Sequence, residues 1–320
     1  MKGKFAVGID IGGTTTKFGI VDNSGNIIEQ DRILTNEHEE VGPFIDDLYK
    51  KLMPMIKRAG GAENFVGIGI GAPNGNLHSG TIEYAPNLVW KGIIPIADLV
   101  TKKFNLPAKL TNDANAAAMG EMLFGACKNC KHFITITLGT GVGSGIVIDG
   151  KIVVGWDGFA GELGHTTIRP GGRLHKGTGL RGSLESYASA TGVRDTAIEM
   201  LTDHPEKPSL LRKYSLDKLT SESVYECAMQ GDAVANQIFE FTGQILGESL
   251  ANFVMFSSPK RIVLFGGLTK AGNLILNPTR KHMELNLLPI FQNKVEIIFS
   301  ELKESDAAIL GASALVWEMK

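Results

Sequence analysis

Residues 5–21 read FAVGIDIGGTTTKFGIV, and residues 133–148 read FITITLGTGVGSGIVI. Each stretch is an apolar strand pattern that runs into a glycine-rich turn and then into a second apolar strand, which the pattern places at 17–21 in the first stretch and at 145–148 in the second. A shift of 127 residues superimposes the two glycine turns and also places Asp22 on Asp149. Because one shift aligns both turns, the pattern indicates a duplicated unit. Two unrelated glycine-rich hairpins in one mixed sheet are the alternative.

Helical and strand patterns alternate along the rest of the chain. The spacing predicts helices over 43–59, 96–104, 112–124 and 305–318, strands over 65–70, 108–111 and 261–265, and a long helical region over 221–256 that Gly231 interrupts. This alternation predicts an α/β fold, with a mostly parallel or mixed sheet covered by helices on both faces. Ligands bind such sheets where the strands end in loops.

The composition is that of an ordinary globular protein, since 43% of the 320 residues are hydrophobic and 21% are charged. The formal net charge is −2, which provides no attraction to nucleic acid or to an anionic membrane. The 39 glycines are unusually many and cluster in short runs between apolar segments, as in loops that bind a ligand through their backbone. We therefore expect a small-molecule ligand, and no nucleic acid or membrane partner.

Cysteine content and hydropathy favour a soluble cytoplasmic protein. Three cysteines are too few for a secreted disulfide framework. Cys127 and Cys130 lack a second cysteine pair with which to bind zinc, and we interpret them as thiols in a turn. The first strand begins at Phe5, which leaves no room for a signal peptide, and no apolar run approaches the roughly 18 residues of a membrane span.

The first glycine turn, Asp10-Ile-Gly-Gly-Thr-Thr15, places a carboxylate at a strand end beside unobstructed backbone N–H groups and hydroxyls. Consecutive N–H groups bind anions, and the carboxylate suits Mg²⁺ beside nucleotide phosphates. Lys17 is within reach of a phosphate, unless it is a solvated strand lysine. A purely structural hairpin is the alternative for the whole turn.

The second turn, Leu138-Gly-Thr-Gly-Val-Gly143, repeats this device. Two such loops fit a triphosphate. Neither is a P-loop, because no G-x-x-x-x-G-K-[ST] pattern occurs. A dinucleotide pattern is also absent, because its third glycine would fall on Ser144.

Further polar residues lie at a strand-to-helix junction and in the second half. Asp113 is ionised near neutral pH and suits a base that accepts a hydroxyl proton during phosphoryl transfer, although Asn112 or Asp113 also suits a helix cap. Glu162, His165 and Glu185 supply two carboxylates and an imidazole, as sugar hydroxyls require. Surface carboxylates and a core histidine are the alternatives for these three.

Together and in this order, these pieces resemble the ROK family of sugar kinases, within the actin/hexokinase/Hsp70-like superfamily. The resemblance covers essentially the whole chain. The matching stretches are 10–17, 85–88 (APNL), 112–118 (NDANAAA), 138–145, 161–165 and the Gly266-Gly267 pair.

The resemblance implies a duplicated actin-like ATPase (ribonuclease H-like) fold with two lobes, 1–118 plus 303–320 and 119–302, that close over the sugar. It implies that Asp113 is the general base. It also implies that the hexose pocket is lined by Asn87, Asn112, Glu162, His165 and Glu185. The residues implied around Mg²⁺ and ATP are Asp10, Gly12, Gly13, Thr14, Thr15, Lys17, Thr140, Gly141, Gly143, Gly266, Gly267 and Gly311.

The sequence departs from the family pattern at two places. ROK proteins commonly bind zinc through a histidine and three cysteines, but the cysteine positions here, counted back from Glu185, are Lys176, Thr178 and Ser183. Since none is a thiol and His165 with the adjacent His175 cannot complete a structural site, we expect no zinc. Residues 73–75 read PNG, whereas the family usually has glycine directly after the proline, and this difference bears on sugar selection.

The first functional hypothesis is an ATP-dependent hexose kinase that phosphorylates glucose at O6. The alternatives are a kinase for another hexose or for an N-acetylhexosamine such as N-acetylmannosamine, a non-catalytic sugar sensor, and a sugar-responsive repressor. Repressors of this group carry a helix-turn-helix ahead of the kinase-like region, and four residues precede the first strand here. The resemblance further implies a homodimer or homotetramer.

Overall fold

The computed structural model describes residues 4–317, which form two compact units. The first unit comprises residues 4–131, 145–161 and 300–317, and the second comprises His132–Ser144 and Glu162–Phe299. The lobes predicted from the sequence, 1–118 plus 303–320 and 119–302, concern which residues move together, and they remain a prediction.

The first unit contains a five-stranded sheet with the order β3-β2-β1-β4-β7. Its strands are β1 (Phe5–Ile11), β2 (Thr15–Asp22), β3 (Ile27–Leu34), β4 (Phe65–Gly71) and β7 (Ala108–Thr111). β1 pairs antiparallel with β2 and parallel with β4, and β4 pairs parallel with β7. A small hairpin of β5 (Ile82–Glu83) and β6 (Ile93–Ile94) lies apart from this sheet.

A second five-stranded sheet has the order β10-β9-β8-β11-β12. Its strands are β8 (Phe133–Leu138), β9 (Val142–Ile148), β10 (Lys151–Ile152), β11 (Arg261–Phe265) and β12 (Glu296–Phe299). The strand order matches that of the first sheet, with the three consecutive strands of each copy in the same places. This match confirms the duplicated α/β fold that the repeated glycine turn predicts.

The glycine turns are shorter than the sequence predicts. We expected the strand after each turn to begin at Lys17 and at Gly145, but β2 begins at Thr15 and β9 at Val142. Threonine and valine are β-branched and favour the extended conformation, so pairing starts as soon as the turn closes.

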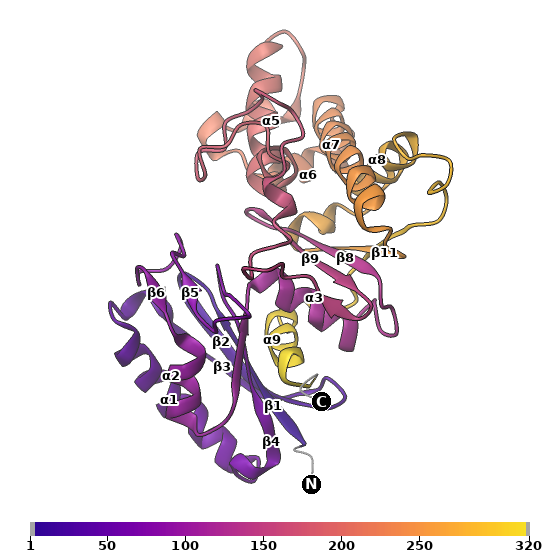
Figure 1. Ribbon diagram of the computed structural model, residues 1–320. Coiled ribbons are helices and arrows are strands. Elements are labelled where there is room, and N and C mark those ends of the chain that lie inside the picture. The colour runs from indigo at the N-terminus through magenta and orange to yellow at the C-terminus, as the bar shows by residue number, and fades with distance from the viewer. Residues whose placement is uncertain (1–3, 318–320) are drawn as a thin grey trace. The chain divides into compact units, whose positions relative to one another are not determined.

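Helices cover both faces of the first sheet (Figure 1). The helices of this unit are α1 (Val41–Arg58), α2 (Ile96–Phe104), α3 (Asp113–Leu123) and α9 (Ala307–Trp317). α1 and α2 share a hydrophobic core with the inward side chains of β1, including Val7 and Ile9. On the opposite face α9 comes very close to the sheet, since a Cβ at Gly8 would lie 2.0 Å from the Ile309 carbonyl oxygen.

The second unit is richer in helices. They are α4 (Glu185–Ala188), α5 (Ala190–Asp203), α6 (Ser221–Met229), α7 (Ala233–Ser257) and α8 (Asn273–Leu285). The predicted interruption of the long helical region is confirmed, because α6 ends before Gly231, whose φ of 83° is left-handed. Helices α5 and α8 were not assigned from the sequence. Within residues 4–317, no helix is both long enough and apolar enough to span a lipid bilayer.

Candidate functional site

In the first unit, Asp10 and Asp113 lie at the ends of β1 and β7, the two strands that flank β4. Asp10 lies near the end of β1, and Asp113 follows β7 as the first residue of α3. A Cβ added to Gly71 would lie 3.8 Å from Asp10 Oδ1 and 3.9 Å from Asp113 Cα, so both residues border the same glycine. Burial, and then the negative charge of Asp113, raise the pKa of Asp10 to about 6, and Lys17 opposes this rise.

The helix cap is Asn112, which decides between the two candidates at this junction. The Asn112 side-chain oxygen accepts a hydrogen bond from the Asn115 N–H at 2.6 Å. Asp113 is therefore available for other chemistry. Its side chain still reaches solvent, but surrounding protein removes much of its hydration, and this burial raises its pKa, while the Ala114 N–H works in the opposite direction.

The segment that carries Asn87 lies directly over the first glycine turn. A Cβ at Gly13 would lie 2.3 Å from the Asn87 carbonyl oxygen, so only glycine permits this approach. Lys17 stands opposite Asp10 in the register of β1 and β2. The structure thus brings Asp10, Gly13, Lys17 and Asn87 together around one strand end.

The departure at residues 73–75 has a conformational explanation. Asn74 adopts a left-handed φ of 50°, a region that favours glycine and that asparagine tolerates better than most residues. Its side-chain amide donates to the Glu83 carbonyl oxygen at 2.9 Å. Asn74 therefore keeps the backbone path that a glycine would take and adds a bond to the opposite side of the loop.

In the second unit, Glu185 borders the second glycine turn. Its Oε2 accepts a hydrogen bond from the Val142 N–H at 2.7 Å, and its Oε1 lies 3.0 Å from His175 Nε2. His165 Nε2 lies 3.8 Å from Glu162 Oε2, while its buried Nδ1 has no hydrogen-bond partner among the described residues. A buried polar atom without a partner suits a site that awaits a polar ligand.

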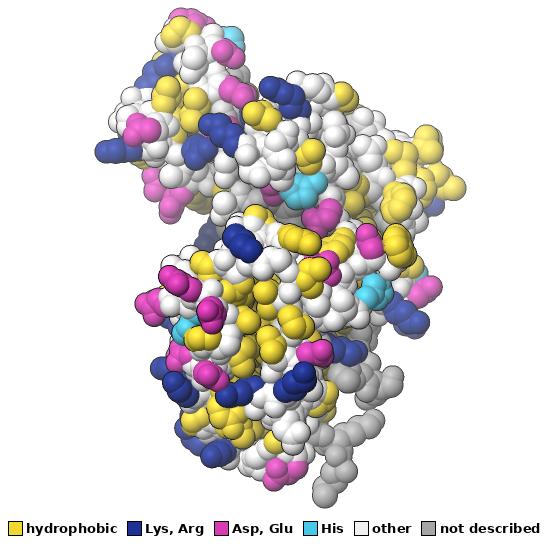
Figure 2. Space-filling view, turned by 60° about the vertical axis from the view of Figure 1, so that its left-hand side comes forward, with side chains coloured by type: hydrophobic (Ala, Val, Ile, Leu, Met, Phe, Trp, Pro, Cys, Tyr) yellow, Lys and Arg dark blue, Asp and Glu magenta, His cyan; other side chains and the backbone are white. Residues whose placement is uncertain are grey.

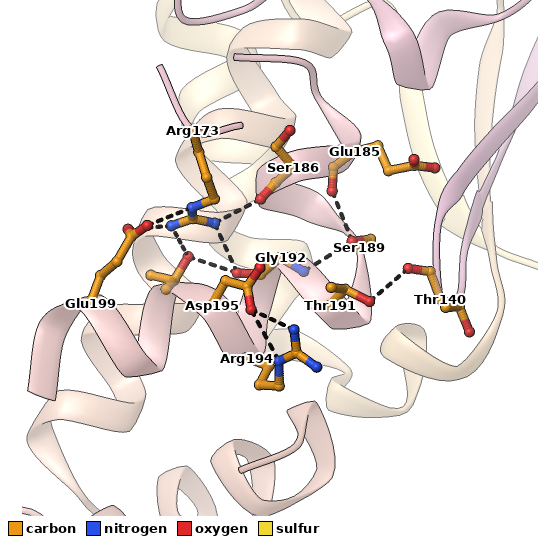
Figure 3. Close-up of polar contacts among 11 residues, drawn as sticks. Thr140, Arg173, Glu185, Ser186, Ser189, Thr191, Gly192, Arg194, Asp195 and Glu199 are labelled. Carbon is orange, nitrogen blue, oxygen red and sulfur yellow. Dashed lines mark hydrogen bonds and ion pairs between the residues drawn. The ribbon is translucent and has the colours of Figure 1, made fainter. Parts of the chain in front are cut away.

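The second glycine turn is fastened from several sides. The Gly143 N–H donates to Thr137 Oγ1 at 3.0 Å, and the Gly139 N–H donates to the Gly141 carbonyl at 3.0 Å. Figure 3 shows Thr191, at the start of α5, donating to the Thr140 carbonyl at 3.1 Å. The turn is therefore ordered by its own strand, by α4 and by α5.

The remaining glycines predicted to surround a nucleotide occupy different settings. Gly266 follows β11 with a left-handed φ of 106°, and Gly267 is exposed beside it. Gly311 is buried in α9, where a Cβ would lie 2.5 Å from the Ala116 carbonyl oxygen in α3. The position of Gly311 explains close helix packing, and its contact with a nucleotide remains a prediction.

The residues at the family's cysteine positions do not fit zinc. Lys176 is exposed, Thr178 Oγ1 hydrogen-bonds His175 Nδ1 at 2.9 Å, and Ser183 Oγ hydrogen-bonds Ser186 Oγ at 2.8 Å. None supplies a thiolate, and the two hydroxyls are already used. Across residues 4–317, no group of three or more His, Cys, Asp or Glu side chains is arranged to hold a metal ion.

Sequence reasoning considered His175 only as a metal ligand and did not single out Arg173. The Arg173 guanidinium contacts Glu199 at 2.5 Å and 2.8 Å and donates to the Ser186 and Gly192 carbonyls at 2.7 Å and 3.1 Å (Figure 3). Backbone carbonyls carry no sequence signal. For His175, the sequence offers one indication: it directly precedes Lys176, which stands where ROK proteins commonly have a zinc-binding cysteine.

Comparison with known proteins places this arrangement in a family. The family model described as the ROK family matches residues 6–319. The chain belongs to the ROK family. Among its ROK relatives, a glucokinase from Halalkalibacterium halodurans is 37% identical over 99% of this chain and 96% of its own length.

Solved structures and regulators complete the comparison. The ROK family glucokinase from Streptomyces griseus, determined with glucose and AMPPNP, is 32% identical, has a TM-score of 0.78 and matches 97% of this chain and 98% of its own. A xylose repressor from Caldicellulosiruptor bescii is 30% identical over 97% of this chain and 77% of its own length. The ROK family therefore includes both sugar kinases and transcriptional repressors that are similar to this chain.

Proposed function

We propose that this ROK protein is an ATP-dependent hexose kinase that transfers a phosphoryl group to O6 of glucose. The observation that carries the proposal is the carboxylate of Asp113, which the Asn112 cap leaves available at the start of α3, beside Asp10. The similarity to glucokinases along nearly the whole chain supports the same activity.

In this proposal Asp113 is the general base. A sugar hydroxyl attacks the γ-phosphorus, its O–H proton passes to the Asp113 carboxylate, and the bond between the γ-phosphorus and ADP breaks. Burial raises the pKa of Asp113, which makes its carboxylate a better proton acceptor than that of an ordinary aspartate. Because the transition state of phosphoryl transfer is loose, positioning and charge stabilisation contribute most of the catalysis.

Asp10 is the residue that would hold Mg²⁺, directly or through water. Burial and then the negative charge of Asp113 raise the pKa of Asp10, and a divalent cation would offset both effects on its carboxylate. When bound with ATP, Mg²⁺ neutralises charge on the phosphates. One or two carboxylates suffice for such a site, since Mg²⁺ takes its other ligands from water and phosphate.

The sugar and the nucleotide are assigned to the residues that the family resemblance indicates. We propose Asn87, Asn112, Glu162, His165 and Glu185 for the sugar hydroxyls. We propose the turns at 10–15 and 140–143, with Lys17 and Gly266-Gly267, for Mg²⁺-ATP. Hydroxyls need both donors and acceptors, and this set of amides, carboxylates and an imidazole supplies both.

The test is ADP release over a panel of hexoses and N-acetylhexosamines, with the product identified by NMR. We expect turnover with glucose and phosphate on O6, and Asp113→Asn is expected to lower kcat about 10³-fold. Asp98→Asn is the matched control, because Asp98 is also in the first turn of a helix of this unit but is exposed and outside the site. Preferred turnover of an N-acetylhexosamine would change the substrate, and saturable sugar binding without turnover would indicate a sensor.

The same purified protein tests the partner predictions. On the face shown in Figure 2, basic and acidic side chains are intermixed, which fits a protein without a nucleic acid partner. Sequence-specific DNA retention would support a repressor instead. We propose a cytoplasmic homodimer or homotetramer, and light scattering would measure its mass in solution.

A further inference from the structure

The Glu185 carboxylate is held at both of its oxygens. Oε2 accepts from the Val142 N–H at 2.7 Å, and Oε1 lies 3.0 Å from His175 Nε2. The carboxylate fills the space beside the second glycine turn, since a Cβ at Gly141 would lie 2.3 Å from Oε2. Two bonds leave about two of the four lone-pair positions of the carboxylate for a ligand hydroxyl.

His175 is itself oriented on its other side. Its Nδ1 lies 2.9 Å from the Thr178 hydroxyl, which suits donation from Thr178 to Nδ1 and from Nε2–H to Glu185. The two side chains are mostly buried, with side-chain exposures of 23% for His175 and 12% for Glu185. The His175 imidazole therefore completes a chain of contacts from Thr178 through His175 and Glu185 to Val142.

The segment that carries His175 is a hairpin with fixed legs. The Leu184 N–H donates to the Thr166 carbonyl at 3.0 Å near its base, and the Gly182 N–H donates to the Arg173 carbonyl at 2.8 Å. Closer to the tip, the His175 N–H donates to the Leu180 carbonyl at 2.8 Å. These bonds determine where the His175 backbone lies.

Arg173 fastens the same leg to the helices behind it. Its side chain is only 9% exposed and stacks over the Tyr187 ring at 4.6 Å. Figure 3 shows it binding the Gly192 carbonyl and the Glu199 carboxylate. Since His175 is two residues further along this leg, the anchor also limits where the imidazole lies. The hairpin is thus cross-linked by side chains at the place where the family resemblance implies a metal.

We propose that His175 is a positioning residue that takes over the role of a metal cross-link and holds Glu185 for sugar binding. Glu185 in turn ties down the second glycine turn through Val142, so one imidazole supports both the acceptor for sugar hydroxyls and the loop assigned to phosphate. The sugar-binding part of this proposal rests on the proposed hexose kinase function, whereas the fastening of Val142 does not.

The experiment compares His175→Ala with His175→Gln, whose amide donates to Glu185 and accepts from Thr178. His204→Ala is the matched control, because His204 is a half-exposed histidine of the same unit, paired with Glu206 and outside the hairpin. We expect His175→Ala to raise Kd and KM for glucose about tenfold with kcat changed less than threefold, and His175→Gln to recover most of the affinity. We expect His204→Ala to behave as the unchanged protein.

A second measurement is independent of sugar chemistry. Hydrogen exchange of residues 139–145 is expected to become about tenfold faster in His175→Ala and to stay near its original rate in His175→Gln and His204→Ala. If the protein binds no hexose but exchange behaves in this way, the hexose kinase proposal fails and the role of His175 stands. Unchanged exchange in His175→Ala would overturn the role of His175, whatever the sugar result.

Metal analysis completes the test. After treatment with a chelator, we expect unchanged thermal stability and glucose affinity, and well below one zinc per chain. Stoichiometric zinc, or loss of glucose binding on chelation that added zinc restores, would overturn the replacement of a metal by His175. Circular dichroism of each variant separates a loss of folding from a loss of positioning.

Discussion

The two glycine turns have the same origin but different chemistry. Asp10 stands at the end of β1, and the position 127 residues later, in β8, is Thr137. Asp10 contributes a carboxylate whose pKa is raised to about 6, whereas the Thr137 hydroxyl accepts the Gly143 N–H and closes its own turn. The first turn therefore supplies charge, and the second supplies neutral backbone donors that its neighbours hold in place.

This difference shows how a duplicated backbone takes on two tasks. The strand order of both sheets is the same, so the fold alone does not distinguish the copies. The distinction comes from single side chains at the turns and from Glu185, which reaches the second turn from α4. Each of the following variants tests one side of the comparison.

Among the variants at or near the two turns, the largest effect is expected at Asp10. If the first turn provides the charge that holds Mg²⁺, Asp10→Asn lowers kcat about 10²- to 10³-fold, a loss typical of removing one electrostatic group from an active site. The measurement is kcat at several Mg²⁺ concentrations. The double variant Asp10→Asn/Thr137→Asp moves the carboxylate to the second turn and is expected to remain inactive. Restored activity in this double variant would show that the two turns are interchangeable.

The same Asp10→Asn variant is expected to stabilise the metal-free protein. The folded-state pKa of about 6 is above the ordinary value of 3.8, so the folded protein holds its proton more tightly than the unfolded chain does. Stability from this group is present below pH 4 and is lost as the pH rises through 6. The variant should therefore gain up to about 3 kcal/mol at pH 8 and almost nothing at pH 4, measured by urea unfolding.

Gly8 tests a second difference between the two sheets, which is how closely a helix packs on the strand. Its counterpart in the second sheet is Thr135, whereas a Cβ at Gly8 would lie 2.0 Å from the Ile309 carbonyl of α9. We expect Gly8→Ala to cost more than about 3 kcal/mol, because backbone has to move. Gly42→Ala in α1 is the control, since its Cβ meets nothing within 4 Å apart from its chain neighbours. Pro43 offsets the helix propensity of alanine there, and we expect stability to change by no more than about 1 kcal/mol.

Several parts of this fold follow from the sequence. The 127-residue repeat predicts the glycine turn of each sheet and the strands that flank it, and separate apolar patterns predict β4, β7 and β11, whereas β12 was not assigned. The Asn112 cap is the residue type that helix starts prefer. The hairpin at 166–184 does not follow, because bonds to backbone carbonyls hold it and these are the same for every residue type. The pairing of Glu185 with Val142 was also hidden, since they are far apart in the chain and one partner is a backbone N–H.

The Arg173→Ala variant tests how strongly the hairpin beside the second turn depends on the Arg173 side chain. Arg173→Ala is expected to cost about 2–4 kcal/mol, because it removes a largely buried guanidinium that binds the Ser186 and Gly192 carbonyls and Glu199. Arg194→Ala is the control, since that side chain is 42% exposed and pairs with the adjacent Asp195, and about 0.5 kcal/mol or less is expected. Equal losses in thermal unfolding would show that the hairpin is not fastened by Arg173.

The smallest expected effect separates two threonines of one strand. Thr137 Oγ1 accepts the Gly143 N–H at 3.0 Å, whereas Thr135 Oγ1 is buried without a hydrogen-bond partner in the described part of the chain. Thr137→Val is therefore expected to cost about 1 kcal/mol and to loosen the turn, while Thr135→Val, which removes an unsatisfied hydroxyl, is expected to be neutral or stabilising. Denaturant unfolding of both variants measures the difference. If Thr137→Val left both stability and the KM for ATP unchanged, the second turn would not need the bond between the Gly143 N–H and Thr137. The two turns would then differ only in the negative charge that Asp10 supplies.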